Sequence, residues 1–158
     1  YQTTYIKDQN AKNQLHIQKF KRNGLSKDTT ITSEKLYLDV VSILYQLRNT
    51  DFSKIKINQK TPMPSVFHLE LYDLYWRYAG KEKITIKKGE TYNCIKVCPC
   101  FVEGNLFDKG EVMTIWLTDD ENRIPILVES KLKIGSIRAV MENVKGNKYP
   151  LTSKIEKK

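Results

Sequence analysis

The sequence predicts a mainly β protein, a curled antiparallel sheet or partial barrel of about nine strands wrapped around one helix. Three observations lead to this prediction. Short segments with alternating apolar residues recur between turn signals, as in all-β sandwiches and barrels. Only residues 39–48 show convincing helical periodicity. Residues 111–141 are predicted to form three consecutive strands joined by two turns, which is the local unit of an antiparallel sheet.

Length, composition and charge describe a globular chain. At 158 residues, with 40% hydrophobic and 28% charged residues, we expect a single β-rich domain covering residues 1–158. No apolar run approaches the ~18 residues of a membrane span. The net charge of +9 invites a nucleic-acid or anionic-membrane interpretation. The lysines are scattered and many alternate with isoleucine, as on the solvated face of a strand. We therefore predict no nucleic-acid binding, and attraction to an anionic envelope surface fits better.

The N-terminal part is expected to form strands. Residues 3–6 and 15–20 have weak alternating patterns. Asn23 and the glycine after it form a strong turn signal. Residues 28–33 suit a further short strand or an extended connection.

The predicted helix runs from Asp39 to Arg48. Its apolar face recurs at helical spacing, through Val40, Ile43, Leu44 and Leu47. Asp39 suits the N-cap, and Arg48 lies at the end of the helix where the dipole favours a cation. Because a helix of about three turns is not stable alone in water, this face is expected to pack on a sheet.

Strand patterns continue after the helix, at residues 55–57, 66–72, 74–78, 84–86 and 92–97. Pro62 and Pro64 are expected to break the chain before the second of these segments. Asp73 is expected to interrupt the strand before the third. The closing three-stranded unit then covers residues 112–118, 124–128 and 134–141.

Cys94, Cys98 and Cys100 lie close together in the sequence. A metal site would need a fourth ligand, and only His16 and His68 are available as histidines. Two cysteines at positions i and i+2 of an extended strand are separated by a distance near the outer limit for a disulfide. We expect buried or unpaired thiols and no metal or other cofactor, with a disulfide and a metal site as alternatives. The odd number also allows a partner cysteine in an absent N-terminal part.

Oxygen ligands gather at the first turn of the closing unit, in Asp119, Asp120, Glu121 and Asn122. A calcium ion could use them, but its ligands would have to converge from more than one segment. Turn chemistry is the favoured interpretation, because Asp and Asn side chains bond their own backbone. Pro125, two residues after Arg123, indicates an edge position or a bulge just past this turn.

Paired carboxylates could also serve a hydrolase, with Asp108, Asp119, Asp120 and Glu129 as candidates. Nothing places one desolvated carboxyl beside another, and no nucleophile motif or glycine-rich phosphate loop occurs. We therefore predict a protein that is not an enzyme and name no catalytic residue.

Arg48 is expected to form a partly buried pair with Asp39, Asp51 or Asp119 that fixes the helix on the sheet. The alternative is an anion-binding arginine in a cavity. Aromatic side chains could line an apolar pocket, although they suit the core of a twisted sheet better. The candidate ligand-binding residues are Arg48, Tyr45, Trp76 and Trp116. The candidate structural residues are Asp39, Arg48, Asp119, Asp120, Arg123 and Pro125.

A family resemblance rests on particular residues. They are Asp39, Ser42, Tyr45 and Arg48 of the helix, Asp51 and Phe52, Tyr78, Gly80, Glu82, Gly89, Cys94 and Phe107, the stretch IWLTDDENRIPILVES, and Gly135 and Ser136. With these residues the chain resembles the domain-of-unknown-function family 3108, exported proteins of Gram-negative bacteria. The combination of the helix with the stretch WLTDDENRIP is the specific part of the resemblance.

The resemblance implies export to the periplasm or envelope. The chain opens on Tyr1 rather than methionine, so we expect a processed or truncated form from which an export signal was removed. The resemblance also implies a signal peptide and extra N-terminal strands, which we expect to be missing from this chain. The family carries no agreed activity. By analogy only, a curled sheet around a helix is similar to the lipoprotein-carrier fold.

Three functions remain open. The first is an exported envelope protein that binds an amphiphilic or lipid-like ligand, without catalysis, in a cavity between sheet and helix. The second is a structural or interaction scaffold with a filled core, and the third a carboxylate-dependent hydrolase. The expected partner is a lipid-like ligand or an envelope protein, with no membrane span and no particular oligomeric state predicted.

Overall fold

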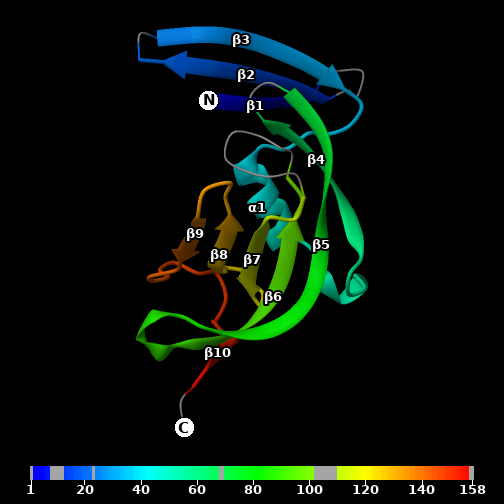
Figure 1. Cartoon of the computed structure of the whole chain (residues 1–158). Coiled ribbons are helices and arrows are strands. Elements are labelled where there is room, and N and C mark those ends of the chain that lie inside the picture. The colour runs from blue at the N-terminus through cyan, green and yellow to red at the C-terminus, as the bar shows by residue number, and fades with distance from the viewer. Residues whose placement is uncertain (1, 8–12, 23, 68–69, 102–109, 157–158) are drawn as a thin grey trace. The chain divides into compact units, whose positions relative to one another are not determined.

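In the computed structural model the chain is mainly β, as predicted. The structure describes residues 2–7, 13–22, 24–67, 70–101 and 110–156. In these residues the strands form two antiparallel sheets (Figure 1). One sheet has the order β1-β2-β3, and the seven-stranded sheet has the order β4-β5-β6-β7-β8-β9, with β10 paired to β6. Asn23, His68, Phe107 and Asp108, which the sequence singles out, lie outside the described residues.

The strands are β1 Gln2–Lys7, β2 Asn13–Lys21, β3 Gly24–Ser33, β4 Lys60–Phe67, β5 Glu70–Thr85, β6 Thr91–Pro99, β7 Met113–Thr118, β8 Pro125–Lys131, β9 Ser136–Val140 and β10 Lys154–Ile155. The helices are α1 Val40–Arg48 and two short 3-10 turns, η1 Phe52–Lys54 and η2 Lys87–Gly89.

The chain divides into two compact units, which are described separately. Unit 1 comprises Tyr1–Ile43 and Met63–Asp73, and unit 2 comprises Leu44–Pro62 and Leu74–Lys158. The chain passes from one unit to the other within α1, within β4 and within β5.

Unit 1 contains the three-stranded sheet. β2 pairs with both β1 and β3, which confirms the strands predicted near residues 3–6, 15–20 and 28–33. Alternation along β2 turns Leu15 and Ile17 inward, and both are almost fully buried with Tyr37 and Val66 in a small core. The core therefore lies on one face of β2.

Helix α1 begins one residue after the predicted start. The Ser42 N–H donates to Oδ1 of Asp39 at 2.8 Å, so Asp39 is the N-cap. Ile43 and Leu47 are buried as predicted. The predicted apolar face was wrong at Val40, whose side chain is 53% exposed. Val40 is the first helical residue, and the buried stripe of this helix begins only a turn later.

Three predictions about residues 51–85 were wrong. Residues 55–57 are not a strand, because Asp51 caps the 3-10 turn η1 and a bend follows. Pro62 and Pro64 lie within β4 instead of breaking the chain before it. β4 is at the end of the seven-stranded order, and an edge strand tolerates proline because proline lacks only an N–H donor.

Asp73 does not interrupt a strand either, since β5 is continuous for 16 residues (Figure 1). The irregularity lies further along, where the register with β6 shifts between Tyr78 and Gly80. Gly80 has a φ of +96°, which side-chain-bearing residues rarely adopt. The bulge therefore falls at the glycine and not at the aspartate.

Unit 2 contains the predicted closing unit, now seen as β7, β8 and β9 with antiparallel register. The register of β7 against β8 shifts between Trp116 and Leu117, opposite Pro125, which confirms the bulge predicted there. The core includes Tyr92, Cys94, Trp116, Ile126 and Leu127. Cys94, Cys98 and Cys100 are buried free thiols, as predicted.

Candidate functional site

The turn between β7 and β8 is held by the carboxylate of Asp120. Oδ1 accepts hydrogen bonds from the Thr118 hydroxyl at 2.8 Å and from the Asn122 N–H at 3.0 Å. Oδ2 accepts the Ser153 hydroxyl at 2.6 Å and the Ser153 N–H at 3.3 Å. The first two bonds are the local turn chemistry predicted for this stretch, and the last two tie in residues far along the chain.

The hydrogen bonds to Asp120 also determine its ionisation. Burial alone would raise its pKa, since a low-dielectric site disfavours the charged form. The hydrogen bonds from Ser153, Thr118 and the backbone N–H groups outweigh burial and hold the pKa of Asp120 below its usual value. Asp120 is therefore ionised at neutral pH, and both of its carboxylate oxygens accept hydrogen bonds from other residues of unit 2.

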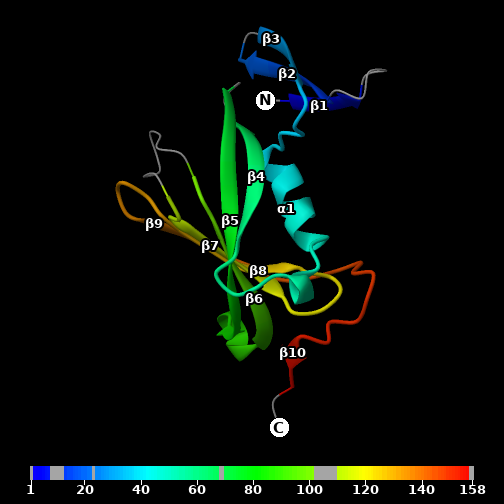
Figure 2. The ribbon, with the colours of Figure 1, turned by 90° about the vertical axis from the view of Figure 1, so that its right-hand side faces the viewer.

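Asn122 joins the same turn to the chain between β9 and β10. Its Nδ2 donates to the carbonyl oxygens of Tyr149 at 2.9 Å and Pro150 at 3.2 Å, and its Oδ1 accepts the Tyr149 N–H at 3.0 Å. The amide thus pairs with the backbone as a neighbouring strand would. Figure 2 shows this chain segment leading past the turn to β10.

Asp119 and Arg123 belong to the same turn and have charged or aromatic partners. Asp119 forms ion pairs with Lys81 at 2.7 Å and with Arg123 at 3.5 Å. The Arg123 guanidinium also lies over the Phe52 ring, 5.5 Å from its centroid. Arg123 has a φ of +50°, the left-handed conformation of a tight turn. These contacts are structural.

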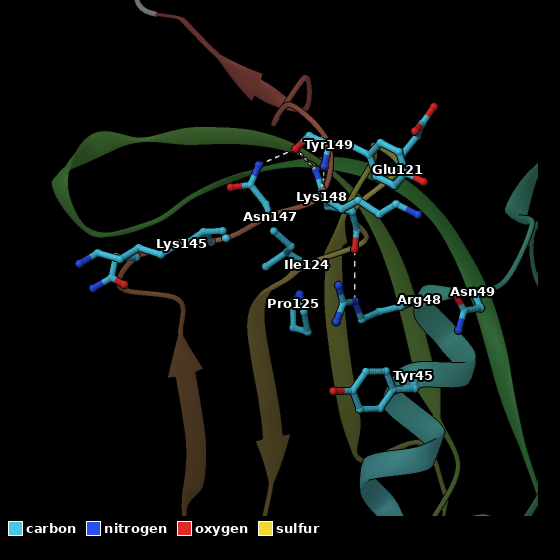
Figure 3. Close-up of a pocket in the computed structure, with 14 residues that line it drawn as sticks. Tyr45, Arg48, Asn49, Glu121, Ile124, Pro125, Lys145, Asn147, Lys148 and Tyr149 are labelled. Carbon is cyan, nitrogen blue, oxygen red and sulfur yellow. Dashed lines mark hydrogen bonds between the residues drawn. The ribbon is translucent and has the colours of Figure 1, made fainter.

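A pocket of about 740 Å³ opens beside the turn (Figure 3). Three segments of unit 2 line it: the end of α1, the turn leading into β8, and the chain after β9. The lining residues are Tyr45, Arg48, Asn49, Glu121, Asn122, Ile124, Pro125, Asn143, Val144, Lys145, Gly146, Asn147, Lys148 and Tyr149. The pocket lies at the end of the helix and not beneath its apolar face, where Leu47 is fully buried.

Arg48 forms one wall of the pocket. Its Nε donates to the carbonyl oxygen of Asn122 at 3.2 Å, and its guanidinium lies 5.8 Å from the centre of the Tyr45 ring. In the described part of the chain no ion pair involves Arg48. Of its three predicted partners, Asp39 and Asp51 cap helical turns and Asp119 pairs with Lys81 and Arg123. The expected carboxylate is thus replaced by a backbone carbonyl, and Arg48 has no ion-pair partner among the residues that the structure describes.

The charge of the pocket is positive. Of the described lining residues, Arg48, Lys145 and Lys148 are basic and Glu121 alone is acidic. Lys148 lies over the Tyr149 ring, 5.0 Å from its centroid. Ile124, Pro125 and Val144 supply apolar surface. Figure 3 shows Arg48 and Tyr45 extending from α1 toward Ile124 and Pro125.

The four predicted ligand-binding residues separate into two pairs. Tyr45 and Arg48 line the pocket. Trp76 is 1% exposed and stacks at a tilt on Phe52, with ring centroids 5.7 Å apart. Trp116 is also buried, its Nε1 donates to Glu82, and Lys96 covers its ring at 5.3 Å. Both tryptophans belong to the core of unit 2.

Sequence reasoning missed the chain after β9 as part of a site. Residues 143–149 carry neither a periodic pattern nor a catalytic motif. The only signal there is the pairing of lysines with asparagines around Gly146, which indicates a turn.

No cluster of three or more His, Cys, Asp or Glu suited to a metal occurs among the residues that the structure describes. Within the same residues, no helix has the length and apolar character of a membrane span.

Comparison with known proteins identifies one family. The family model of "Protein of unknown function (DUF3108)" matches residues 6–142, which includes α1 and all of β2 to β9. No curated protein and no solved structure matches the chain.

Proposed function

We propose that the chain, which belongs to the DUF3108 family, is a non-catalytic binding protein whose unit 2 pocket takes an amphiphile with an anionic end. The observation that carries the proposal is the combination of size, charge and apolar surface in one pocket. A volume of about 740 Å³ is within the range of small-molecule sites, which are mostly apolar with a few polar groups that orient the ligand.

The anionic end is inferred from Arg48. A guanidinium recognises carboxylate and phosphate groups through several N–H donors in a fixed geometry. Among the described residues, the guanidinium of Arg48 donates a hydrogen bond through Nε to a neutral carbonyl and not to a carboxylate, so its charge is available to a ligand. Lys145 and Lys148 add charge of the same sign at the same pocket.

The apolar end is inferred from the opposite wall. Ile124 and Pro125 are half-buried and lie where β8 begins. Val144 comes from the chain after β9 and is half-buried as well. Tyr45 is 58% exposed on the helix and offers an amphipathic ring beside Arg48. An acyl chain against these side chains would remove apolar area from water.

The arrangement of carboxylates supports a function without catalysis. A glycosidase-type site needs two carboxyls flanking one bond. Asp119 and Asp120 are engaged in ion pairs and hydrogen bonds that hold the turn. Glu121 is the one carboxylate among the pocket-lining residues that the structure describes.

We also propose that the protein is exported to the envelope, as the family resemblance implies. Fractionation of the host, with an antibody against this chain, would test the location. Recovery in the cytoplasmic fraction alone would contradict it.

Calorimetric titration of the chain with matched twelve-carbon amphiphiles tests the binding proposal. Dodecyl phosphate and dodecanoate should bind at least about tenfold more tightly than dodecyl maltoside, because hydrogen bonds to charged groups are the stronger ones. Arg48→Met should remove this preference and Arg48→Lys should restore part of it. Tyr45→Ser should weaken all three ligands.

Lys83→Met is the matched control, since Lys83 is an exposed lysine of unit 2 that does not line the pocket. It should bind like the unaltered chain. Equal affinity for anionic and neutral amphiphiles, or binding unaffected by Arg48→Met, would contradict the proposal. No binding at all, together with capture of an envelope protein, would favour the scaffold function instead.

A further inference from the structure

The end of the β2–β3 hairpin in unit 1 exposes two large apolar side chains. Phe20 on β2 and Leu25 on β3 are direct cross-strand partners. They are 49% and 52% exposed, whereas Leu15 and Ile17 on the same strand are 0% and 2% exposed. The hairpin thus buries its apolar residues near the sheet core and presents an apolar pair at its tip.

Basic residues surround this pair. Lys19 and Lys27 are cross-strand partners next to Phe20 and Leu25, and Lys21 pairs with Gly24 at the last step of the ladder. Arg22 follows in the turn and is exposed. We call Lys19, Phe20, Lys21, Arg22, Leu25 and Lys27 the tip cluster. No acidic residue occurs between Asp8 and Asp28, so the cluster has a charge of one sign.

The nearest acid after the tip cluster does not neutralise it. Asp28 is bonded to the His16 ring and accepts a hydrogen bond from Gln18 at 2.9 Å. These bonds hold the pKa of Asp28 below its usual value. Lys21, Arg22 and Lys27 are exposed beside Phe20 and Leu25, so an external anion can approach them.

We propose that the tip cluster docks on the surface of a bilayer containing anionic lipid. A membrane presents a layer of phosphates above an apolar layer. Phe20 and Leu25 would enter the boundary of the acyl region, while the basic side chains stay at the level of the phosphates. Juxtaposed basic residues contribute to this attraction in proportion to their number and to the anionic lipid present.

An apolar pair surrounded by basic side chains suits a bilayer, which has an apolar layer beneath its phosphates, better than it suits a nucleic acid. A duplex carries its phosphates on the outside and offers no apolar layer behind them for Leu25 to enter. The tip cluster also includes only two apolar side chains at the end of a hairpin, far less than the area that a stable dimer buries. Binding of an oligonucleotide and binding of a second copy of the chain are therefore outcomes of the test.

Sedimentation of the full chain with vesicles tests the proposal. Vesicles of phosphatidylcholine with 30% phosphatidylglycerol, a composition of about one anionic lipid in three, should bind the chain, and pure phosphatidylcholine should bind it much less. Raising the salt concentration should release the chain. Replacing both Lys21 and Arg22 by Gln should lower binding by about 25-fold, from roughly fivefold per basic residue near an anionic surface.

Separate variants test the contribution of Phe20 and Leu25 to vesicle binding. Phe20→Ser with Leu25→Ser should lower binding at high anionic lipid content while leaving the salt dependence unchanged. In Phe20→Trp, the new indole should shift its emission to shorter wavelength on adding anionic vesicles. The two native tryptophans are buried, so the difference spectrum against the unaltered chain isolates the new one.

The β8–β9 turn provides a matched control. Ile134 in the turn is 92% exposed and Ile137 on β9 is 50% exposed. This end of the sheet also carries Lys131 and Lys133, but unlike the tip cluster it includes an acid, Glu129, which pairs with Arg138 at 3.1 Å. Ile134→Ser with Ile137→Ser should leave vesicle binding unchanged. Binding lost in this control but not in the tip variants would overturn the proposal. So would absence of binding to anionic vesicles, or binding of an oligonucleotide or a second copy of the chain through the tip cluster in place of vesicles.

Discussion

The β2–β3 and β7–β8 hairpins both join antiparallel neighbours, yet their ends have opposite character. At the end of β7–β8, polar side chains are buried, and Asp120 and Asn122 are 8% and 5% exposed. At the end of β2–β3, Phe20 and Leu25 are about half exposed. A buried polar group is tolerated only when its hydrogen bonds are made, so the first end is part of the fold. An exposed apolar pair adds little to the fold and is available to a partner.

The largest effect is expected from Asp120→Ala. It leaves the buried hydroxyls of Thr118 and Ser153 and the Asn122 N–H without their acceptor. The free energy of unfolding should fall by about 3 kcal/mol, because unsatisfied buried donors bear the full cost of desolvation. Urea denaturation measures this change. Glu121→Ala, at the exposed neighbouring position, should change it by less than about 0.5 kcal/mol.

The contribution of Asp120 should disappear in acid. Its pKa is lowered on folding, so its stabilisation is present above the unfolded pKa of about 4 and is lost as the pH falls through the folded pKa. The stability difference between the unaltered chain and Asp120→Asn should therefore shrink below about pH 4. Urea denaturation from neutral to acid pH measures it. A difference that stays constant would show that the carboxylate is not the ionised acceptor.

Asn122→Ala should cost less, about 2 kcal/mol, through the loss of its bonds to the backbone at Tyr149 and Pro150. Hydrogen exchange should detect a local effect, with faster exchange of the Tyr149 amide. Asn143→Ala is the control, since it removes an exposed amide from the same pocket-lining segment. Unchanged protection at Tyr149 would show that the β7–β8 turn does not hold this segment.

A smaller effect is expected for the thiol of Cys94, which lies on β6 opposite Thr118 of β7. Burial, followed by the charges of Glu82, Asp119 and Asp120, raises the pKa of Cys94 to about 12. In a background with Cys98→Ser and Cys100→Ser, a thiol reagent at mildly alkaline pH should react with Cys94 only as fast as the protein opens. Rapid reaction without urea would contradict the burial of this thiol.

The smallest effect on stability is expected at the other hairpin. Phe20→Ser and Leu25→Ser should each change the free energy of unfolding by less than about 0.5 kcal/mol, as exposed substitutions usually do. Ile17→Ala on the same strand should cost about 2 to 4 kcal/mol, because Ile17 is buried. Thermal or urea denaturation compares them. Equal losses at Phe20 and Ile17 would show that the end of the β2–β3 hairpin belongs to the fold as much as the buried face of β2 does.

Local features were predictable from the sequence where neighbouring residues decide them. Asp39 precedes an amphipathic stretch, and it caps the helix as expected. The strands of the closing unit and the bulge opposite Pro125 follow from alternation and from proline chemistry. The bond from the Asn122 N–H to Asp120 spans two residues, which is why the turn interpretation of this stretch was correct.

Other features were wrong because a distant partner overrides a local signal. Pro62 and Pro64 look like breaks, but an edge position removes the penalty for a missing N–H. The isoleucines at 55 and 57 alternate like a strand, although the cap at Asp51 starts a 3-10 turn just before them.

The sequence by itself determined the mainly β class, the helix from Asp39 to Arg48, the closing strands and the burial of the cysteines, because each depends on periodicity or on contacts within a few residues. Only the tertiary structure decided that Ser153 and Tyr149 return to the β7–β8 turn and that Arg48 faces a carbonyl there instead of a carboxylate. Those bonds join residues tens of positions apart, and no local pattern specifies which distant group satisfies a buried polar atom.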